Sequence, residues 1–519
     1  MKAEDLYEGI GELDEETLEL SEQGRQEKKA INEIADAIKT ETEKQGMQGA
    51  KRISGFARMI GSGILAAAVL ALIIGSVFYL TKGTTGTKAY AIAKAEYPEY
   101  VENPRGKEWH SAKARNEAYQ KWEEFLRKNQ LEEGYEIGVE PYLERSMQVF
   151  LGEAGQQNLA FSPLNVYMAL AMLSETADGE TRAQLLAVLG QDDLLSLRKQ
   201  AQSIWKANYR KEAGATSIMA SSLWLNEGIP YERSTLERVK EHYFASSFQG
   251  RMGDQAYDKA YRDWLNEQTG GLLSEQLSDA HFEPSTETQK SIMTLVTTVY
   301  FKANWAKKFL EANTKPDIFH AASGDRECDF MHSTESVYYW GEHFGAVALP
   351  LQQGDLWMWI ILPDEDSGVE EVLREDVHDM MEVMGSLYGK YDYANQKQLD
   401  VILSLPKFDV SSRLELTNGL QKLGVKDAFE QGQADFSPLL KDDLSKEWGV
   451  FVSKAQHDAR VCIDEEGVTA AAVTQIAMNG TGMPMPNQEE IIFKVDRPFL
   501  FVIAGNQGLP LFAGVVNEP

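Results

Sequence analysis

The chain of 519 residues contains little cysteine and little positive charge. Its two cysteines, Cys328 and Cys462, give no disulfide framework in a chain of this length. Lysine and arginine number 51 against 80 aspartates and glutamates, so the net charge is −29. Because nucleic-acid binding needs clustered cations that neutralise phosphates, this balance argues against a nucleic-acid partner and favours a solvated acidic surface.

The sequence also lacks the common signatures of catalysis and metal binding. No CxxC or HExxH motif occurs and the eight histidines are scattered, so neither a metal nor a small-molecule cofactor is predicted. No GxSxG elbow is present, and no serine, histidine and aspartate stand together in a motif. We therefore expect a protein that is not an enzyme.

One long uncharged run, MIGSGILAAAVLALIIGSVFYL, covers residues 59–80. Its 22 residues are long enough to cross a bilayer, so a single transmembrane helix is predicted. The acidic segment 1–58 ahead of it and the length of the run favour a signal anchor, with cleavage near the small residues of Ala89 to Ala93 as the alternative. Three basic residues precede the run closely and two follow it, which places 1–58 in the cytoplasm and the remainder outside.

Two segments of different composition follow this run. Residues 81–106 begin with TKGTTGT and contain two prolines, which is typical of a tether. Residues 107–131 are charged and helix-forming with aromatic residues on one side, which predicts a stalk helix leaning on the domain or on the membrane. We therefore expect a tail at 1–58, a span at 59–80, a tether and stalk at 81–134, and one domain at 135–519.

The most unusual stretch of the domain is DEEGVTAAAVTQIAMNGTG, at residues 464–482. No charge occurs between Gly467 and Glu489, and the stretch closes in NGTG, which is typical of a loop. Such a segment is predicted to be an exposed loop in one state and a buried strand in another. Read with a period of two, it has one apolar face made by Val468, Ala470, Ala472, Thr474, Ile476 and Met478.

Motifs around this stretch and across the domain resemble those of the serpin family. The resemblance implies an α+β fold with three β-sheets, eight or nine helices and an exposed reactive-centre loop. The matching segments are NLAFSPLN (158–165), LVTTVYFKANW (295–305), LPKF (405–408), FVSKAQH (451–457), EEG (465–467), FKVDRPFLF (493–501) and PLFAG (510–514).

The resemblance implies a monomeric suicide inhibitor of serine proteases that forms a covalent acyl complex. The protease attacks the scissile carbonyl, and the cut loop enters the main sheet before water can finish hydrolysis. The loop then carries the protease away and distorts its active site, driven by new strand pairing. The alternative is a non-inhibitory serpin that acts as a surface binding or scaffold protein, but small uncharged hinge residues favour the inhibitor.

The resemblance also assigns roles to individual residues. The hinge comprises Glu465, Gly467, Val468, Thr469, Ala470, Ala471, Ala472, Val473 and Thr474. The residues expected where the main sheet opens are Trp305, Lys407 and Glu465, with a contact between the last two, and the mid-sheet cluster comprises Ser162, Asn165, Thr297 and His457. The family pattern has serine at position 165 and asparagine at 297, so the amide has moved to the facing position, from which it can preserve a bond to His457.

Counting Glu465 as the first of seventeen residues places the scissile bond between Thr481 and Gly482, with Met478 and Met483 as alternatives. None of these is basic, acidic or aromatic, which argues against a trypsin-like target and favours an elastase-like or subtilisin-like protease. Residues 479–481, NGT, also form a glycosylation sequon, and a glycan there would obstruct docking. A bacterial cell therefore suits the sequence better, and we expect a membrane-anchored bacterial serpin with an extracellular domain.

Overall fold

The computed structural model describes residues 87–519 except 106, 108, 213, 272–281, 283–291, 352–355, 442–443, 454 and 469–488. The predicted tail and membrane span, the hinge from Thr469 onward and all candidate scissile bonds lie outside the described residues. The described residues belong to one compact unit, Leu80–Pro519. Within it, no described helix combines the length and the apolar character that crossing a membrane requires.

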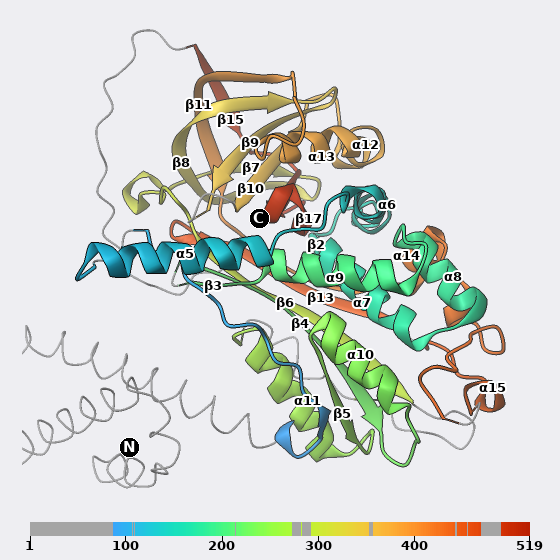
Figure 1. Cartoon of the computed structure of the whole chain (residues 1–519). Coiled ribbons are helices and arrows are strands. Elements are labelled where there is room, and N and C mark those ends of the chain that lie inside the picture. Colours follow the sequence, from blue (N-terminus) through green and yellow to red (C-terminus); the bar gives the residue numbers. More distant parts are fainter. Residues whose placement is uncertain are drawn as a thin grey trace, which may run out of the picture. The chain divides into compact units, whose positions relative to one another are not determined.

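Eleven α-helices and two large sheets make up the described residues, in an α+β arrangement (Figure 1). The expectation of three sheets is corrected because strand β8 (Gly324–Trp340) is long enough to pair with three neighbours and joins two sheets into one. The helix number also exceeds the expected eight or nine. Two helices, α12 (Val369–Glu375) and α13 (Val377–Ser386), are divided only at Asp376, and α15 (Leu444–Trp448) is short.

The eight-stranded sheet is the one that holds the hinge, and its order is β1-β5-β4-β6-β14-β13-β12, with β3 paired to β4. Both faces of β4 (Ala215–Asn226) are buried: Met219 and Leu223 join the main core, whereas Ala220 and Trp224 join a second core. This alternation suits a central strand covered on both sides. The other strands are β1 (Ala91–Ala93), β3 (Arg210–Glu212), β5 (Ala245–Gly250), β6 (Met293–Asn304), β12 (Phe408–Glu415), β13 (Gln456–Ile463) and β14 (Gly467–Val468).

The nine-stranded sheet has the order β15-β11-β8-β9-β10-β16-β17-β2, with β7 paired to β8. Strand β15, which follows the undescribed loop, pairs in parallel with β11 at one edge. The loop therefore runs from the first sheet to this one. Besides β8, the strands are β2 (Leu159–Phe161), β7 (Lys315–Ala321), β9 (Phe344–Pro350), β10 (Trp357–Pro363), β11 (Gln396–Pro406), β15 (Glu490–Lys494), β16 (Phe499–Ala504) and β17 (Pro510–Val516).

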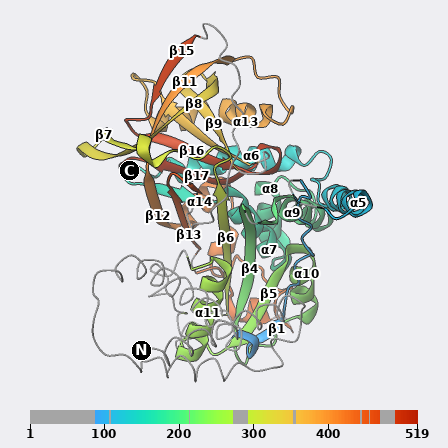
Figure 2. The ribbon, with the colours of Figure 1, turned by 90° about the vertical axis from the view of Figure 1, so that its left-hand side faces the viewer.

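The helices cover both faces of the eight-stranded sheet. Figure 2 shows α11 (Gln255–Gln268) on one face and α7 (Pro163–Thr176), α9 (Leu194–Asn208) and α10 (Arg233–Tyr243) on the other. Helix α7 is almost wholly buried and begins with Ser162 as its cap and Pro163 at its first position. The remaining helices are α5 (Ala112–Lys128), α6 (Glu136–Leu151), α8 (Gly179–Val188) and α14 (Thr417–Leu423).

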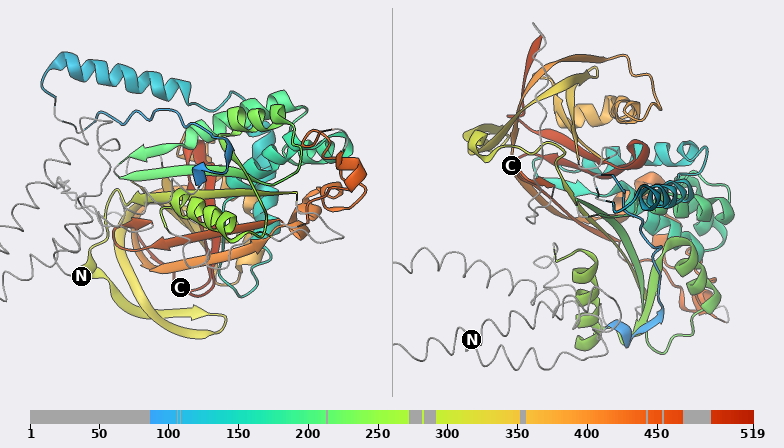
Figure 3. Two further views of the ribbon diagram at one scale, coloured as in Figure 1. Left: turned by 90° about the horizontal axis from the view of Figure 1, so that it is seen from below. Right: turned by 60° about the vertical axis from the view of Figure 1, so that its left-hand side comes forward.

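Residues 87–105, predicted as part of a tether, lie along the edge of the eight-stranded sheet. Strand β1 pairs antiparallel with β5. The ring centroids of Tyr97 and Trp205 are 5.1 Å apart, and those of Tyr100 and Phe125 on α5 are also 5.1 Å apart. Helix α5, the predicted stalk, buries none of its residues and lies at the margin of the domain (Figure 3). This N-terminal strap therefore extends the folded unit beyond the predicted boundary at residue 135.

A buried carboxylate joins three helices behind the sheet. The fully buried side chain of Glu175 on α7 accepts hydrogen bonds from Arg198 of α9 and from Arg238 and Tyr243 of α10. Burial alone would raise the pKa of this carboxyl, but the hydrogen bond and charge of Arg198, aided by Tyr243 and Arg238, hold the pKa below its usual value. The group is therefore ionised at neutral pH.

We expect Glu175→Gln to lower the melting temperature markedly, because breaking a buried ion pair from one side typically costs about 3–5 kcal/mol. The matched control is Glu124→Gln, which removes an exposed pair with Lys128 and should leave the melting temperature unchanged. Because the pKa of Glu175 is lowered in the fold, its stabilisation is complete at neutral pH and is lost as the pH falls below about 4.3. Equal melting temperatures for the two variants would show that the cluster adds no stability.

Candidate functional site

The described part of the predicted hinge already lies inside the sheet. Gly467 and Val468 form the two-residue strand β14, which pairs with Asn304 and Ala303 of β6. Val468 also pairs with Ile463 of β13 and is only 1% exposed. The first hinge residues thus occupy the sheet before any cleavage, a feature that no sequence motif indicates.

A tight turn delivers the chain from β13 into β14. The carboxylate of Asp464 accepts hydrogen bonds from the backbone N–H groups of Glu466 and Gly467, at 2.8 and 3.1 Å. A Cβ atom at Gly467 would lie 2.3 Å from the carbonyl oxygen of Ala303, so only glycine allows this approach. Asp464 is a site residue that sequence reasoning missed, although its position before EEG is typical of a turn-forming aspartate.

Trp305, Lys407 and Glu465 meet at the top of the sheet. The ammonium of Lys407 lies 3.3 Å from a carboxylate oxygen of Glu465, and that oxygen also accepts a hydrogen bond from Thr314. Burial alone would raise the pKa of Glu465, but the hydrogen bonds from Thr314 and Lys407 hold it below its usual value. The indole N–H of Trp305 donates to the carbonyl of Asp464 at 2.7 Å. These contacts fix the start of the hinge.

The segment that follows β6 holds the same turn through its backbone. The N–H of Trp305 donates to the carbonyl of Glu466, and the N–H of Phe309 donates to the carbonyl of Glu465, both at 3.1 Å. Lys308 forms an ion pair with the carboxylate of Glu466. The turn is therefore clamped from β6 as well as from Lys407, and Lys308 joins the residues that the sequence motifs did not reveal.

Ser162, Asn165 and His457 come together where α7 begins beneath the sheet. The backbone N–H of Ser162 donates to Nε2 of His457 at 3.0 Å, and the hydroxyl of Ser162 accepts from the backbone N–H of Asn165 at 3.3 Å. His457 is 4% exposed, and burial lowers its pKa to about 4 despite the opposing charge of Asp458. The imidazole is therefore neutral at physiological pH.

The bond proposed between the amide of Asn165 and His457 is not formed. The Nε2 atom of His457 is taken by the backbone of Ser162, and both polar atoms of the Asn165 side chain are buried without a hydrogen-bond partner among the described residues. Thr297 lies on β6, opposite Ser221 of β4. Because buried amides are nearly always hydrogen-bonded, the amide of Asn165 is an unusual feature of this cluster.

Below β14, no described strand pairs with the edges that β6 and β13 turn toward each other. Strand β6 pairs with β4 along its length on one side, but on the other side it pairs only with β14, at Ala303 and Asn304. Strand β13 pairs with β12 along its whole length and with β14 only at Ile463. Among the described strands, none pairs with the remaining edges, residues 293–302 of β6 and 456–462 of β13. We call these two facing edges the central seam.

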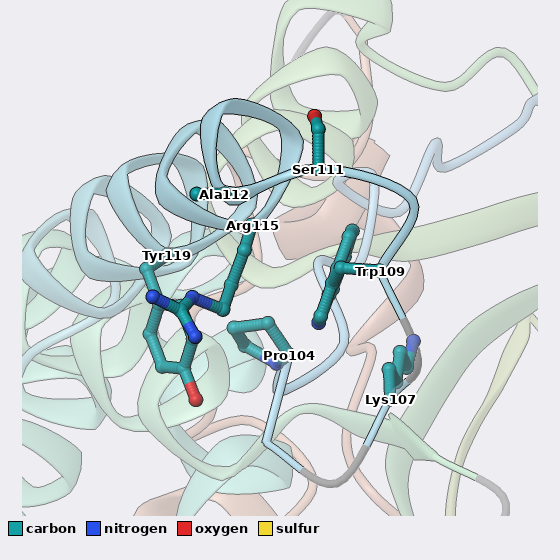
Figure 4. Close-up of a pocket in the computed structure, with 7 residues that line it drawn as sticks. All are labelled: Pro104, Lys107, Trp109, Ser111, Ala112, Arg115 and Tyr119. Atoms are coloured by element: carbon teal, nitrogen blue, oxygen red, sulfur yellow. The ribbon is translucent and has the colours of Figure 1, made fainter.

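We also searched the rest of the described chain for metal ligands, reactive thiols and pockets. The described residues contain no group of three or more histidine, cysteine, aspartate or glutamate side chains placed to hold a metal ion. Both cysteines are free thiols, and burial, reinforced by nearby aspartates, raises the pKa of each to about 11. A hollow of about 440 Å³ between Pro104 and the start of α5 has Arg115 beside Tyr119, but its charged side chains are exposed and none belongs to the hinge or seam (Figure 4).

Comparisons with known proteins agree with this geometry. Residues 145–519 match the family model described as Serpin (serine protease inhibitor). The chain is 29% identical over 370 residues to a serpin-like protein of Thermococcus kodakarensis, which covers 70% of this chain and 81% of the relative. It is 28% identical over 373 residues to leukocyte elastase inhibitor A of Mus musculus, with 70% and 93% covered.

Among solved structures, the thermophilic serpin tengpin in its native state matches with a TM-score of 0.64 and 26% identity, over 76% of this chain and 98% of that one. The family model spans most of the chain and includes the top of the sheet, the mid-sheet cluster and the central seam. The chain therefore belongs to the serpin family.

Proposed function

We propose that this serpin is a suicide inhibitor of serine proteases that traps its target by inserting the cut loop into the central seam. Relatives named plasminogen activator inhibitor 1 (Sus scrofa) and leukocyte elastase inhibitor A support protease inhibition in general. The observation that carries the proposal is the seam itself: two strand edges with which no described strand pairs continue directly from the position that the first hinge residues already occupy.

The register of β14 supports insertion of the residues that follow it. Continued along β6, this register brings Ala470 opposite Phe301 and Ala472 opposite Val299. Phe301 belongs to the main core and Val299 packs against it, so Ala470 and Ala472 would face the core on the side of Val468. Small uncharged side chains can make this passage quickly, whereas an ion on that face would cost several kcal/mol.

The same register bounds how far the loop can travel. Residues 469–478 would pair with residues 302 down to 293 of β6, which fills its free edge. At about 3.3 Å per residue, a protease bound near the end of this segment would move about 30 Å. Such a displacement separates the acyl-enzyme from the pole where it formed.

The chemistry before insertion is that of an ordinary acyl transfer. The protease serine attacks the carbonyl carbon of Thr481, and the amine of Gly482 leaves with the C-terminal segment, which stays bound through β15. The acyl-enzyme remains attached to residue 481 while the preceding residues enter the seam. Small and apolar residues around this bond favour an elastase-like or subtilisin-like target.

We further propose that residues 59–80 anchor a monomeric serpin domain on the outer face of a bacterial cell. Only six residues, 81–86, separate this predicted span from Thr87, the first described residue. Strand β1, Ala91–Ala93, pairs with β5 at the edge of the sheet. The short sequence distance between the predicted span and strand β1 supports a domain held near the membrane surface.

We expect the full-length protein to form a complex that survives denaturing electrophoresis when it is incubated with an elastase-type or subtilisin-type enzyme. The C-terminal fragment should begin at Gly482, as mass spectrometry can establish. A fragment that begins at Asn479 would move the reactive residue to Met478 and leave the mechanism intact. If every such enzyme cuts the loop and leaves no complex, the non-inhibitory scaffold is favoured instead.

Cutting the loop should raise the thermal stability sharply. Among the described strands, none pairs with the two edges of the central seam, and an inserted segment would add hydrogen bonds on both sides and bury apolar surface. The measurement compares melting temperatures before and after cleavage within residues 478–483. An unchanged melting temperature would indicate a loop that cannot enter the sheet.

We expect Ala472→Arg to convert the inhibitor into a substrate. A guanidinium opposite Val299 would have to enter the core, and a barrier increase of about 3 kcal/mol slows insertion roughly a hundredfold. The acyl-enzyme would then be hydrolysed before it is trapped. The expected result is cleavage at the same bond, an unchanged melting temperature of the uncut protein, and loss of the covalent complex.

The matched control for this substitution is Ala471→Arg. Residue 471 would stand opposite Tyr300, on the other face of the sheet, so this variant should trap protease much better. Similar behaviour of the two variants would mean that the assigned alternation is wrong. Normal trapping by Ala472→Arg would mean that insertion does not operate in this protein.

A further inference from the structure

Helix α5 carries a row of large side chains that neither hydrophobic core covers. Tyr119, Trp122 and Leu126 follow Arg115 at spacings of four, three and four residues, so all four share one face of the helix. Leu126 is 42% exposed, and Tyr119 and Trp122 are partly exposed. The rings of Tyr119 and Trp122 meet edge to face, with centroids 6.4 Å apart. Neither ring belongs to, or packs against, a core of the described chain.

The helix is attached to the domain through a different side. Phe125 packs edge to face against Tyr100 of the strap. At the start of the helix, Trp109 and Tyr119 line the hollow beside Pro104 (Figure 4). The row of large side chains therefore extends past the helix to Trp109, which is also partly exposed. We call Trp109, Tyr119, Trp122 and Leu126 the α5 stripe.

The α5 stripe lies in a basic part of an acidic chain. Residues 105–128 contain seven lysines and arginines and four glutamates, whereas the whole chain has a net charge of −29. Arg115, Lys121 and Arg127 are exposed and form no ion pair with any described residue; the ion pairs on α5 involve two other lysines. A helix is about 10–12 Å across and the Debye length is about 8–10 Å at moderate salt, so all three cations would interact with a charged surface that touches the stripe.

Sequence and charge point to lipid as the partner of this surface. Tryptophan and tyrosine next to lysine and arginine are typical of segments that lie where lipid headgroups meet acyl chains. The predicted span ends at residue 80 and Thr87 is already buried in the domain, so the six residues between them reach at most about 20 Å. An anionic lipid surface would repel the acidic remainder of the domain and attract residues 105–128.

We propose that α5 is the membrane-facing surface of the domain, with the α5 stripe against the headgroup region and the basic residues drawn to anionic lipids. The inference rests on the proposed anchor at residues 59–80, which would bring the domain within reach of the bilayer. It explains why an amphipathic helix with exposed aromatic residues lies at the margin of the domain (Figure 3). The contact would fix how the domain is oriented on its short tether. The family model begins at residue 145, so this surface lies outside the part shared with relatives.

Brominated lipids test the contact in the full-length protein, because bromine quenches tryptophan fluorescence only at short range. All ten tryptophans lie at residue 109 or beyond, so the signal comes from the domain and not from the tail or the predicted span. In vesicles of phosphatidylcholine and phosphatidylglycerol with brominated acyl chains, we expect the wild type to be quenched. Replacing both Trp109 and Trp122 by phenylalanine should remove the quenching.

Reversing three charges of α5 tests what holds it at the surface. The combined variant Arg115→Glu, Lys121→Glu and Arg127→Glu should lose the quenching and keep the melting temperature of the wild type, because all three side chains are exposed. Wild-type protein in vesicles of phosphatidylcholine alone should likewise lose the quenching. Raising the salt from about 0.1 M to about 1 M should weaken it, since the Debye length falls from about 10 Å to about 3 Å.

The matched control reverses three exposed cations elsewhere on the domain, on α9, α10 and β7. The substitutions are Lys199→Glu, Arg233→Glu and Lys315→Glu. The control and the α5 variant have the same net charge, so only the location of the change differs. We expect the control to be quenched like the wild type.

A second readout separates this inference from the proposed anchor. Resistance of the full-length protein to extraction from the vesicles by alkaline carbonate reports on the anchor, whereas quenching reports on α5. If the protein resists extraction but the wild type is not quenched, or the α5 variant is quenched like the control, the role of α5 is wrong and the anchor stands. Hydrogen exchange of residues 112–128 that slows with protein concentration and not with lipid would show a second copy on the stripe instead. If carbonate removes the protein, the anchor fails and the inference fails with it.

Discussion

The structure depends on one sheet in which two central strands are not paired with each other. Strand edges with free N–H and C=O groups bind other strands readily, and proteins normally cover or blunt them. Here β14 lies at the top of the sheet, directly above the central seam, and no described strand pairs with residues 293–302 of β6 below it. Within the described part of the chain, unused pairing capacity thus lies in the middle of the eight-stranded sheet.

The contacts at the top of the sheet determine where the hinge enters between β6 and β13. Asp464 forms the turn, Gly467 allows the close approach to β6, and the pair between Lys407 and Glu465 holds the start of the hinge. Because Val468 is already buried, the proposed insertion would not need to start a new strand. The next residues only have to extend a strand whose register is set, and growth of an existing pairing avoids the entropic cost of closing a new loop.

Sequence reasoning predicted the parts of this arrangement that depend on local patterns. The meeting of Trp305, Lys407 and Glu465 follows from motifs that can be read along the chain. The apolar alternation beyond Val468 lies outside the described residues and stays a prediction. The pairing of β14, the strap formed by residues 87–105 and the fusion of two sheets by β8 depend on contacts between distant segments. Single-sequence patterns do not encode such registers.

The mid-sheet cluster shows the same limit at the level of one hydrogen bond. The residue types at positions 165 and 297 suggested that the amide of Asn165 bonds His457. In the structure the backbone of Ser162 takes that place, because the start of α7 brings its N–H within 3.0 Å of the imidazole. Either the backbone N–H of Ser162 or the side-chain amide of Asn165 could donate to His457. Which of them does so depends on the exact position of α7, and the residue types alone do not determine that position.

The central claim is that the seam is a vacant strand position that residues 469–478 occupy after cleavage. The most direct test is a crystal structure of the loop-cleaved protein. We predict a new strand between β6 and β13, with Ala472 opposite Val299 and with each edge of the seam paired to it. A cleaved protein in which β6 and β13 pair directly with each other, or keep their open edges while the loop lies outside the sheet, would contradict the account.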